Sequence, residues 1–337
     1  MIAKWTSLLT GTALAGILVL PSLTGGVQAG DAADPPAPVV PPASPAPPMP
    51  WHDGTGSAKW PVHTYSAHNL KVDDLVGNLV VSVSNGGPIT LEAWGSKRRV
   101  DGLHVESHGD EVEVEGSSYE QGWSVWDWRH WFDFSNLGEP RSSDLTVHVT
   151  VPRGADLDID SLVGNATIGD TQGRLRLDAA ATTAKIGHIE SADIDMGGSG
   201  KIQIASVTNA LKLNIGGSGK IWTGPIGSLN ADIAGSGDAV LGPVAGGLSL
   251  DIAGSGDVST PRVNGPVKVE IAGSGSVKIA DGTADPLHVE IMGAGNFTFG
   301  GVAVDPHIEA FGSGEVRIKS YRGKLSSEGM ADVKIGQ

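Results

Sequence analysis

Seven side chains that carry oxygen ligands recur at nearly regular intervals in the C-terminal half of the chain. They lie in the polar phase of alternating segments, so we expect them to stack on one outer edge. Such a stack could bind Ca²⁺, which prefers oxygen ligands. We favour a solvated acidic face and expect no cofactor, because cation sites usually also need backbone or convergent ligands. The seven residues are Asp195, Asn214, Asp232, Asp251, Glu270, Glu290 and Glu309. We expect Lys212 and Lys268, two positions before Asn214 and Glu270, to relieve the repulsion between the acids.

A second candidate site is the aromatic segment GWSVWDWRHWFDFSN at positions 122–136. Exposed aromatic side chains would form an apolar patch suited to stacking on sugars or docking a protein. The same segment could instead be a lid that covers unpaired strand edges. The sequence leaves both interpretations open. The aromatic residues concerned are Trp123, Trp126, Trp128, Trp131, Phe132 and Phe134.

Histidines offer a weaker candidate for metal binding. His104 and His108 are four positions apart, and His63 and His68 are five apart. In a strand, positions four apart are separated by about 13 Å, too far to share one ion without a turn. We interpret these histidines as surface residues. The chain also has no Gly-x-Ser-x-Gly elbow and no HExxH motif, so we expect a protein that is not an enzyme.

Glycine triplets raise the question of a phosphate-binding loop. A phosphate loop precedes a helix whose N-terminus completes the site, whereas each triplet here is followed by another alternating segment. We therefore interpret the triplets as tight corners, for which glycine supplies positive φ and a missing Cβ. The corner glycines are Gly198, Gly200, Gly217, Gly219, Gly235, Gly237, Gly254, Gly256, Gly273, Gly275, Gly293, Gly295, Gly312 and Gly314.

Repetition of these triplets defines the architecture. Their centres lie 18 to 20 residues apart, and apolar side chains alternate with polar ones on both sides of each corner, as in LSLDIAGSGDVST. One such unit cannot offset the entropy of ordering it, but stacked units share a continuous core. The sequence therefore predicts an all-β fold over 155–337: a two-sheeted parallel β-solenoid, expected to be right-handed, with about 19 residues per coil. Residues 61–154 are strand-like without this register, which fits irregular opening rungs and a cap, or a small separate β-domain.

The N-terminal residues predict export. Residues 1–29 combine Lys4, an apolar run and Val27-Gln28-Ala29, a pattern typical of a signal peptide rather than a retained anchor. Residues 30–60 form a proline-rich linker. The net charge of −15 argues against nucleic acid as a partner, and no further apolar run of spanning length follows. Cysteine is absent, which excludes disulfides and thiolate metal sites.

The serial GSG turns, together with VTVPRGADLDIDSLVGNATIGD at 149–170, resemble the bacterial auto-transporter adhesin head GIN domain family over about Tyr65 to Gln337. The resemblance implies a pectin-lyase-like β-helix, export and a role in cell adhesion, and it supplies no catalytic residues. We expect a cell-envelope or surface adhesion and interaction module in the periplasm or on the outer surface of a Gram-negative bacterium, with a protein or glycan partner. The alternatives are a polysaccharide-binding or polysaccharide-cleaving β-helix protein, and a periplasmic structural or regulatory partner of another envelope protein.

Overall fold

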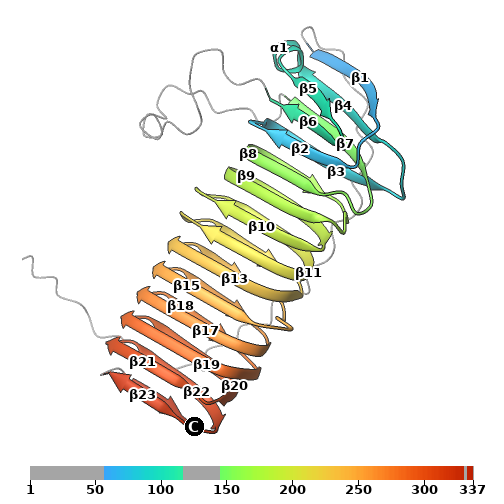
Figure 1. The fold of residues 1–337 in the computed structure, drawn as a ribbon. Helices are drawn as coiled ribbons and strands as arrows, with labels where there is room; N and C mark the ends of the chain where they lie inside the picture. Colours follow the sequence, from blue (N-terminus) through green and yellow to red (C-terminus); the bar gives the residue numbers. More distant parts are fainter. Residues whose placement is uncertain (1–56, 117–144, 330–331, 337) are drawn as a thin grey trace, which may run out of the picture. The chain divides into compact units, whose positions relative to one another are not determined.

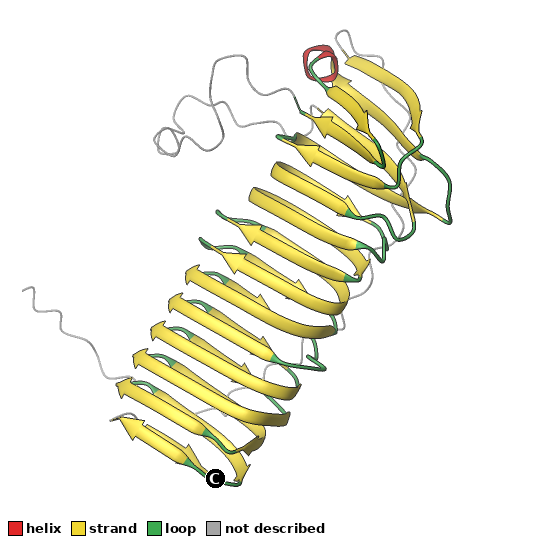
Figure 2. Ribbon diagram, viewed as in Figure 1, coloured by secondary structure: helices red, strands yellow, loops and turns green. Residues whose placement is uncertain are grey.

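The computed structural model describes residues 57–116, 145–329 and 332–336. The predicted signal peptide, most of the predicted linker and the whole aromatic segment at 122–136 lie outside these ranges. Within them the chain is almost entirely β, and the only helix is the five-residue α1 (Lys97–Asp101). The strands stack in parallel coils about 19 residues apart, which confirms the predicted β-solenoid. Figures 1 and 2 show the rungs lying one beside the next.

One face of the solenoid, called sheet I below, begins with β5 (His104–His108), which runs antiparallel to β6. From β6 onward each strand of sheet I pairs in parallel with the next. Its strands are β6 (Glu111–Glu115), β2 (Asn69–Asp73), β8 (Leu157–Ile168), β9 (Arg174–Ile189), β10 (Ser191–Met196), β11 (Lys201–Ile215), β13 (Ile226–Gly235), β15 (Leu248–Gly254), β17 (Val263–Gly273), β19 (Gly282–Gly293), β21 (His307–Gly312) and β23 (Ser326–Gly329).

The second face, sheet II, is reached from sheet I around a tight corner in every coil. The long strands β8, β9 and β11 contribute to both faces. Sheet II opens with the antiparallel neighbours β1, β4 and β7 and becomes parallel from β7 to β3 onward. Its other strands are β1 (Ser57–Tyr65), β4 (Ile89–Ser96), β7 (Leu145–Pro152), β3 (Val76–Ser84), β12 (Lys220–Thr223), β14 (Asp238–Val240), β16 (Asp257–Thr260), β18 (Ser276–Ile279), β20 (Asn296–Val304), β22 (Glu315–Arg322) and β24 (Asp332–Ile335).

From β9 onward, a third, shorter row of backbone pairing closes the coils on the side opposite the glycine corner. Val207 pairs with Ile226, and the isolated bridges Ile226 to Val244 and Val244 to Val263 continue the row. The predicted two-sheeted cross-section therefore gains a short third side. The sequence did not indicate it because each coil contributes only one to three residues there, too few for an alternating pattern.

The core consists of apolar rows that run along the stack. Leu250, Val269 and Val289 are paired neighbours in sheet I, and each is at most 1% exposed. In sheet II, Val277 is followed by Phe297, which is fully buried. Since every coil covers its neighbours' apolar side chains, no coil buries its core alone.

The two glycines of the corner at 254–256 differ in backbone angle but are both crowded by the preceding coil. Gly254 has φ of 140°, in the region that side-chain-bearing residues rarely adopt. Gly256 does not have positive φ, but a Cβ there would lie 2.9 Å from Cγ2 of Ile233 and closer still to the carbonyl oxygen of Gly237. The sequence interpretation assigned both roles to both glycines. In the structure only the first glycine needs the unusual backbone angle, whereas both lie against the preceding coil, since a Cβ on Gly254 would collide with the carbonyl oxygen of Gly235.

The described residues 57–116 and 145–152 belong to the same stack as the repeats. Strand β2 pairs with β8 from Leu70 to Asp73, and β3 pairs with β8 from Val76 to Val81. The corner between β2 and β3 uses Asp74 at φ of 50° instead of a glycine triplet. These opening rungs thus continue both faces of the solenoid without the nineteen-residue sequence pattern.

Candidate functional site

The outer face of sheet I collects the acidic side chains singled out in the sequence. Asp195 pairs with Asn214, and the pairing continues through Asp232, Asp251, Glu270, Glu290 and Glu309. All seven lie in one row at successive rungs. We call this row the acid ladder.

The acid ladder is longer than the sequence indicated. Asp178 precedes Asp195 and Glu328 follows Glu309 in the backbone register. Farther towards the start, Asp73 pairs with both Glu115 and Asp160. The repeat analysis missed these residues because no glycine triplet follows them. The alternation in LDID and LRLD, which ends on Asp160 and Asp178, could have revealed two of them.

Stacking changes how readily the ladder carboxyls ionise. Desolvation raises the pKa of Asp251, and the charges of Glu270 and Asp232 raise it further. Desolvation likewise raises the pKa of Asp178, with Asp195 and Asp160 adding to it. Glu270 differs because the Lys268 ammonium donates a hydrogen bond to it and lowers its pKa; the Nζ–Oε1 distance is 2.6 Å. The ladder is therefore a row of carboxylates only partly compensated by cations.

A second outward row lies two residues before the acid ladder in each strand. At the start of sheet I this row alternates in charge from rung to rung, and we call it the ion-pair row. Its members are Glu113, Lys71, Asp158, Arg176, Asp193 and Lys212. Lys212 lies 3.4 Å from Asp193 on the preceding rung, whereas the sequence interpretation had assigned it to the acid-ladder position at 214. Cross-strand neighbours of opposite charge stabilise a sheet.

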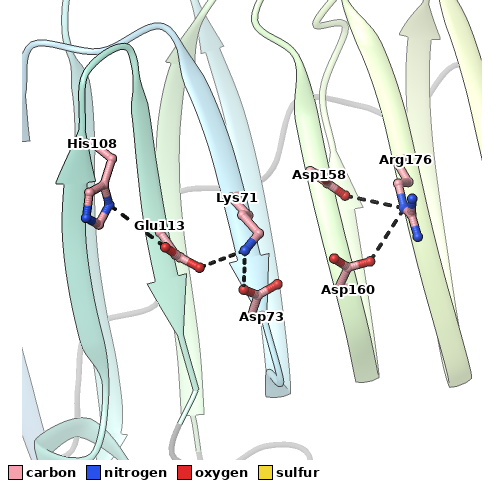
Figure 3. A network of polar contacts seen from close by, with 7 residues as sticks. All are labelled: Lys71, Asp73, His108, Glu113, Asp158, Asp160 and Arg176. Atoms are coloured by element: carbon pink, nitrogen blue, oxygen red, sulfur yellow. Dashed lines mark hydrogen bonds and ion pairs between the residues drawn. The ribbon is translucent and has the colours of Figure 1, made fainter.

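Figure 3 shows the ion-pair row and the acid ladder meeting around Lys71. The Lys71 ammonium lies 2.7 Å from a carboxylate oxygen of Asp73 and 2.7 Å from one of Glu113. Hydrogen bonds to these two acids raise the pKa of Lys71. Lys71 lowers the pKa of Glu113, while burial raises the pKa of Asp73. On the next rungs Arg176 lies 3.6 Å from both Asp158 and Asp160.

From β13 onward the row beside the acid ladder carries little compensating charge. It reads Asn230, Ser249, Lys268, His288 and His307. The rings of His288 and His307 stack with centroids 5.0 Å apart and planes 9° apart, and Nε2 of His307 lies 2.8 Å from Oε1 of Glu309.

Two shallow grooves cross this face. The first has a volume of about 210 Å³ and lies between ladder acids, including Asp232 and Asp251, and the outward alanines Ala234, Ala253 and Ala272. The second, of about 610 Å³, runs along the strand starts and includes Asp156, Arg174 and Asp193 among its lining residues. Both are open surface features that could accommodate an elongated ligand.

The predicted histidine candidates do not converge. His63 packs against Trp60, with ring centroids 5.2 Å apart, and His68 pairs with Asp110 at 2.6 Å. His104 and His108 lie on either side of Glu106, at 3.5 and 3.3 Å. Across the described ranges, no three His, Asp or Glu side chains are arranged to hold a metal ion. The aromatic segment containing Trp126 lies outside the described residues.

Comparisons with known proteins give no family assignment. No family model matches the chain, and no curated protein matches it in sequence, so the resemblance to the adhesin head family rests on the repeat pattern. Similar solved structures include a candidate lipid-binding protein from Parabacteroides distasonis, 16% identical with a TM-score of 0.36, covering 84% of this chain and 95% of that one. A candidate adhesin from Bacteroides fragilis is 14% identical with a TM-score of 0.28, covering 84% and 98%. At such low identities and TM-scores these likenesses do not establish a shared function.

In the described part of the chain, no helix is long and apolar enough to cross a membrane.

Proposed function

We propose that this protein is a non-enzymatic, exported interaction module that uses the outer faces of its solenoid to bind an elongated partner at the bacterial cell envelope. The observation that carries the proposal is the in-register acid ladder, in which seven predicted side chains occupy successive rungs of one face. Parallel strands about 4.8 Å apart present such oxygen-bearing side chains at a nearly fixed spacing.

A repeated surface of this kind suits multivalent binding. An individual exposed ion pair contributes at most about 1 kcal/mol, but linked contacts along a rigid row bind together with a much higher effective concentration. The rigid stack means that little conformational entropy is lost on binding. The proposed partner is therefore a long, repeating protein or glycan rather than a compact small molecule.

The envelope location and the adhesive role rest on sequence features. The signal-peptide pattern at 1–29 and the proline-rich stretch at 30–60 favour export and a spacer that holds the solenoid away from its attachment point. The GSG-turn repeat resembles an adhesin head family. We propose the periplasm or the outer cell surface as the site of action.

A polysaccharide-active protein is the second candidate. The groove of about 610 Å³ along the strand starts of sheet I, whose lining includes the carboxylates of Asp156 and Asp193 as well as Arg174, is the observation that favours it. Carboxyl pairs can cleave glycosidic bonds. Incubating the full chain with pectin-like polymers and assaying reducing or unsaturated sugar ends separates the two functions, because release of such ends would replace the non-enzymatic proposal.

The leading proposal is tested by binding of the full chain to isolated cell envelopes. The triple variant Asp232→Asn, Asp251→Asn, Glu270→Gln removes three consecutive ladder charges and should weaken binding several-fold. The matched control is Asp257→Asn, which removes an exposed acid from sheet II. Absence of envelope binding by the unmodified chain would refute the proposed function, and equal loss in the control would refute the role of sheet I.

A further inference from the structure

A cluster of lysines surrounds a tryptophan on the outer face of sheet II. Lys201 pairs in the backbone register with Lys220 on the next rung, and Gln203 pairs with Trp222. On the rung before, Lys185 lies beside Gln203. These five outward residues occupy three consecutive rungs, and we call them the lysine–tryptophan patch.

The charge of the lysine–tryptophan patch is only partly compensated. Within the described residues, Lys185 and Lys201 form no ion pair within 4 Å, whereas Lys220 lies 2.7 Å from Asp238. Lys201 and Lys220 are direct cross-strand neighbours, and like charges in that position destabilise a sheet. The patch therefore concentrates positive charge on a chain whose net charge is −15.

Trp222 adds an aromatic surface to the same place. It is partly exposed on an outward position between Gln203 and Val240, while its chain neighbours Ile221 and Thr223 are buried. An indole ring on a flat sheet offers an apolar surface on which a sugar ring can stack. The rung before the patch adds hydrogen-bonding side chains, because Asn165 pairs with Thr183 and Thr167 pairs with Lys185.

We propose that the lysine–tryptophan patch binds an acidic polysaccharide, with Lys185 and Lys201 contacting carboxylate groups and a sugar ring stacked on Trp222. The chain of the glycan crosses the strands, so that successive sugar units meet successive rungs. This inference rests on the proposed function, because it names the ligand class of an interaction module. It differs from that proposal in using sheet II and a ligand of negative charge.

The geometry favours a glycan over a membrane surface. The cations and Trp222 lie on neighbouring strands of a sheet, whereas interfacial membrane anchors are typically amphipathic helices with an apolar face of several side chains. A neutral glycan would leave two uncompensated lysines without partners. A carboxylated glycan offers carboxylate groups to the lysines and sugar rings that can stack on the indole of Trp222.

The test measures binding of the full chain to polygalacturonate, with dextran as the neutral polymer and phosphatidylglycerol vesicles as the membrane arm. Binding to polygalacturonate should weaken with salt, because contacts between exposed charges are screened. The double variant Lys185→Ala, Lys201→Ala should weaken it about tenfold. Trp222→Ala should weaken it to a similar extent, and the double variant keeps the test valid if Trp222→Ala fails to fold.

Lys278 provides the matched control. It lies in the same outward row three rungs beyond Trp222, is exposed and forms no ion pair within the described residues. Lys278→Ala should leave binding unchanged. Equal binding to dextran, preferential binding to the vesicles, no binding to polygalacturonate, or equal loss in Lys278→Ala would each overturn the inference. If envelopes still bind while polygalacturonate does not, only this inference fails; if polygalacturonate binds and envelopes do not, the envelope proposal fails.

Discussion

The two halves of the outer face of sheet I have the same backbone arrangement but differ in how many cations accompany their acids. In the first half, from β6 to β10, cations and acids alternate along the ion-pair row, and Lys71 lies between Asp73 and Glu113. The ladder acids continue through the second half, from β13 to β21, but there Lys268 is the only lysine or arginine in the adjacent row. In the first half, ion pairs between neighbouring strands therefore offset most of the charge, whereas in the second half most ladder acids have no cation beside them.

The comparison indicates that the repeated corners and the buried core determine the fold, while the charges of the outward side chains can vary from coil to coil. Both halves bury the same apolar columns, since Leu177 in β9 and Leu250 in β15 are 0% and 1% exposed. Outward side chains contribute little to stability, so the charge pattern of the second half is available for binding.

The largest expected effect concerns the core that both halves share. Leu177→Ala and Leu250→Ala each delete a buried side chain in the same column and should each lower the free energy of unfolding by about 2–5 kcal/mol. Chemical denaturation followed by circular dichroism measures both. A loss in one half much smaller than in the other would show that the two halves do not share one continuous core.

The corners should distinguish crowded glycines from open ones. Gly256→Ala introduces a Cβ against the carbonyl oxygen of Gly237 and Cγ2 of Ile233, so it should cost about 1–3 kcal/mol. Gly197, after β10, has no atom within 4 Å of an added Cβ, and Gly197→Ala should change stability by about 0.5 kcal/mol or less. Equal melting temperatures for the two variants would contradict the assignment of the second triplet glycine to close coil contact.

Loss of a lysine should destabilise the first half of the face more than the second. Lys71→Met leaves Asp73 and Glu113 facing each other and should cost about 1–2 kcal/mol at pH 7, whereas Lys268→Met removes one exposed pair and should cost less than about 1 kcal/mol. Because Lys71 lowers the pKa of Glu113, the stability from this pair is present above the ordinary glutamate pKa. It is lost as the pH falls through the lowered value, so the cost of Lys71→Met should shrink at acidic pH.

Removing a ladder charge should stabilise the second half slightly. The pKa of Asp251 is raised by desolvation and by Glu270, so its ionised form is disfavoured in the folded state. Asp251→Asn should therefore raise the free energy of unfolding at pH 7 by about 0.5 kcal/mol or less. The advantage should vanish below the ordinary aspartate pKa of about 4, where the wild-type carboxyl is protonated. A destabilised Asp251→Asn would mean that the ladder carboxylates have stabilising partners.

The smallest expected effect is that of calcium. The ladder acids stack side by side without the converging ligands that Ca²⁺ requires, so millimolar Ca²⁺ should leave the melting temperature unchanged relative to Mg²⁺. A rise specific to Ca²⁺ that disappears in the double variant Asp251→Asn, Glu270→Gln would instead make the second half of the face a metal site.

Local patterns were sufficient to predict the repeat. The alternation in Leu248, Leu250 and Ile252 and the triplet Gly254-Ser255-Gly256 predicted strands, corners and stacked coils, and the buried faces agree with that alternation. The same patterns predicted that the acids at 232, 251 and 270 share a row. These features are encoded locally because the period of the strand fixes which side chains face outward.

The pairing of segments far apart in the chain could not be predicted from the sequence. Asp73, Glu115 and Asp160 are brought to neighbouring rungs although 42 to 87 residues separate them. Lys185, Lys201 and Lys220 form one patch only because consecutive coils place them side by side. The partner of Lys212 was also decided in three dimensions, where Asp193 on the adjacent rung lies within 3.4 Å.

The sequence by itself determined the coil, because apolar alternation and obligatory glycines repeat often enough to specify one register. Beyond the row of repeated acids, the tertiary structure decided which charged side chains lie next to one another on each face. A side chain's neighbours across the rungs lie about 19 residues or more away in the chain, and only the stacking register determines which of them become neighbours in space. The contrast between the paired first half and the uncompensated second half of sheet I therefore emerged only from the folded protein.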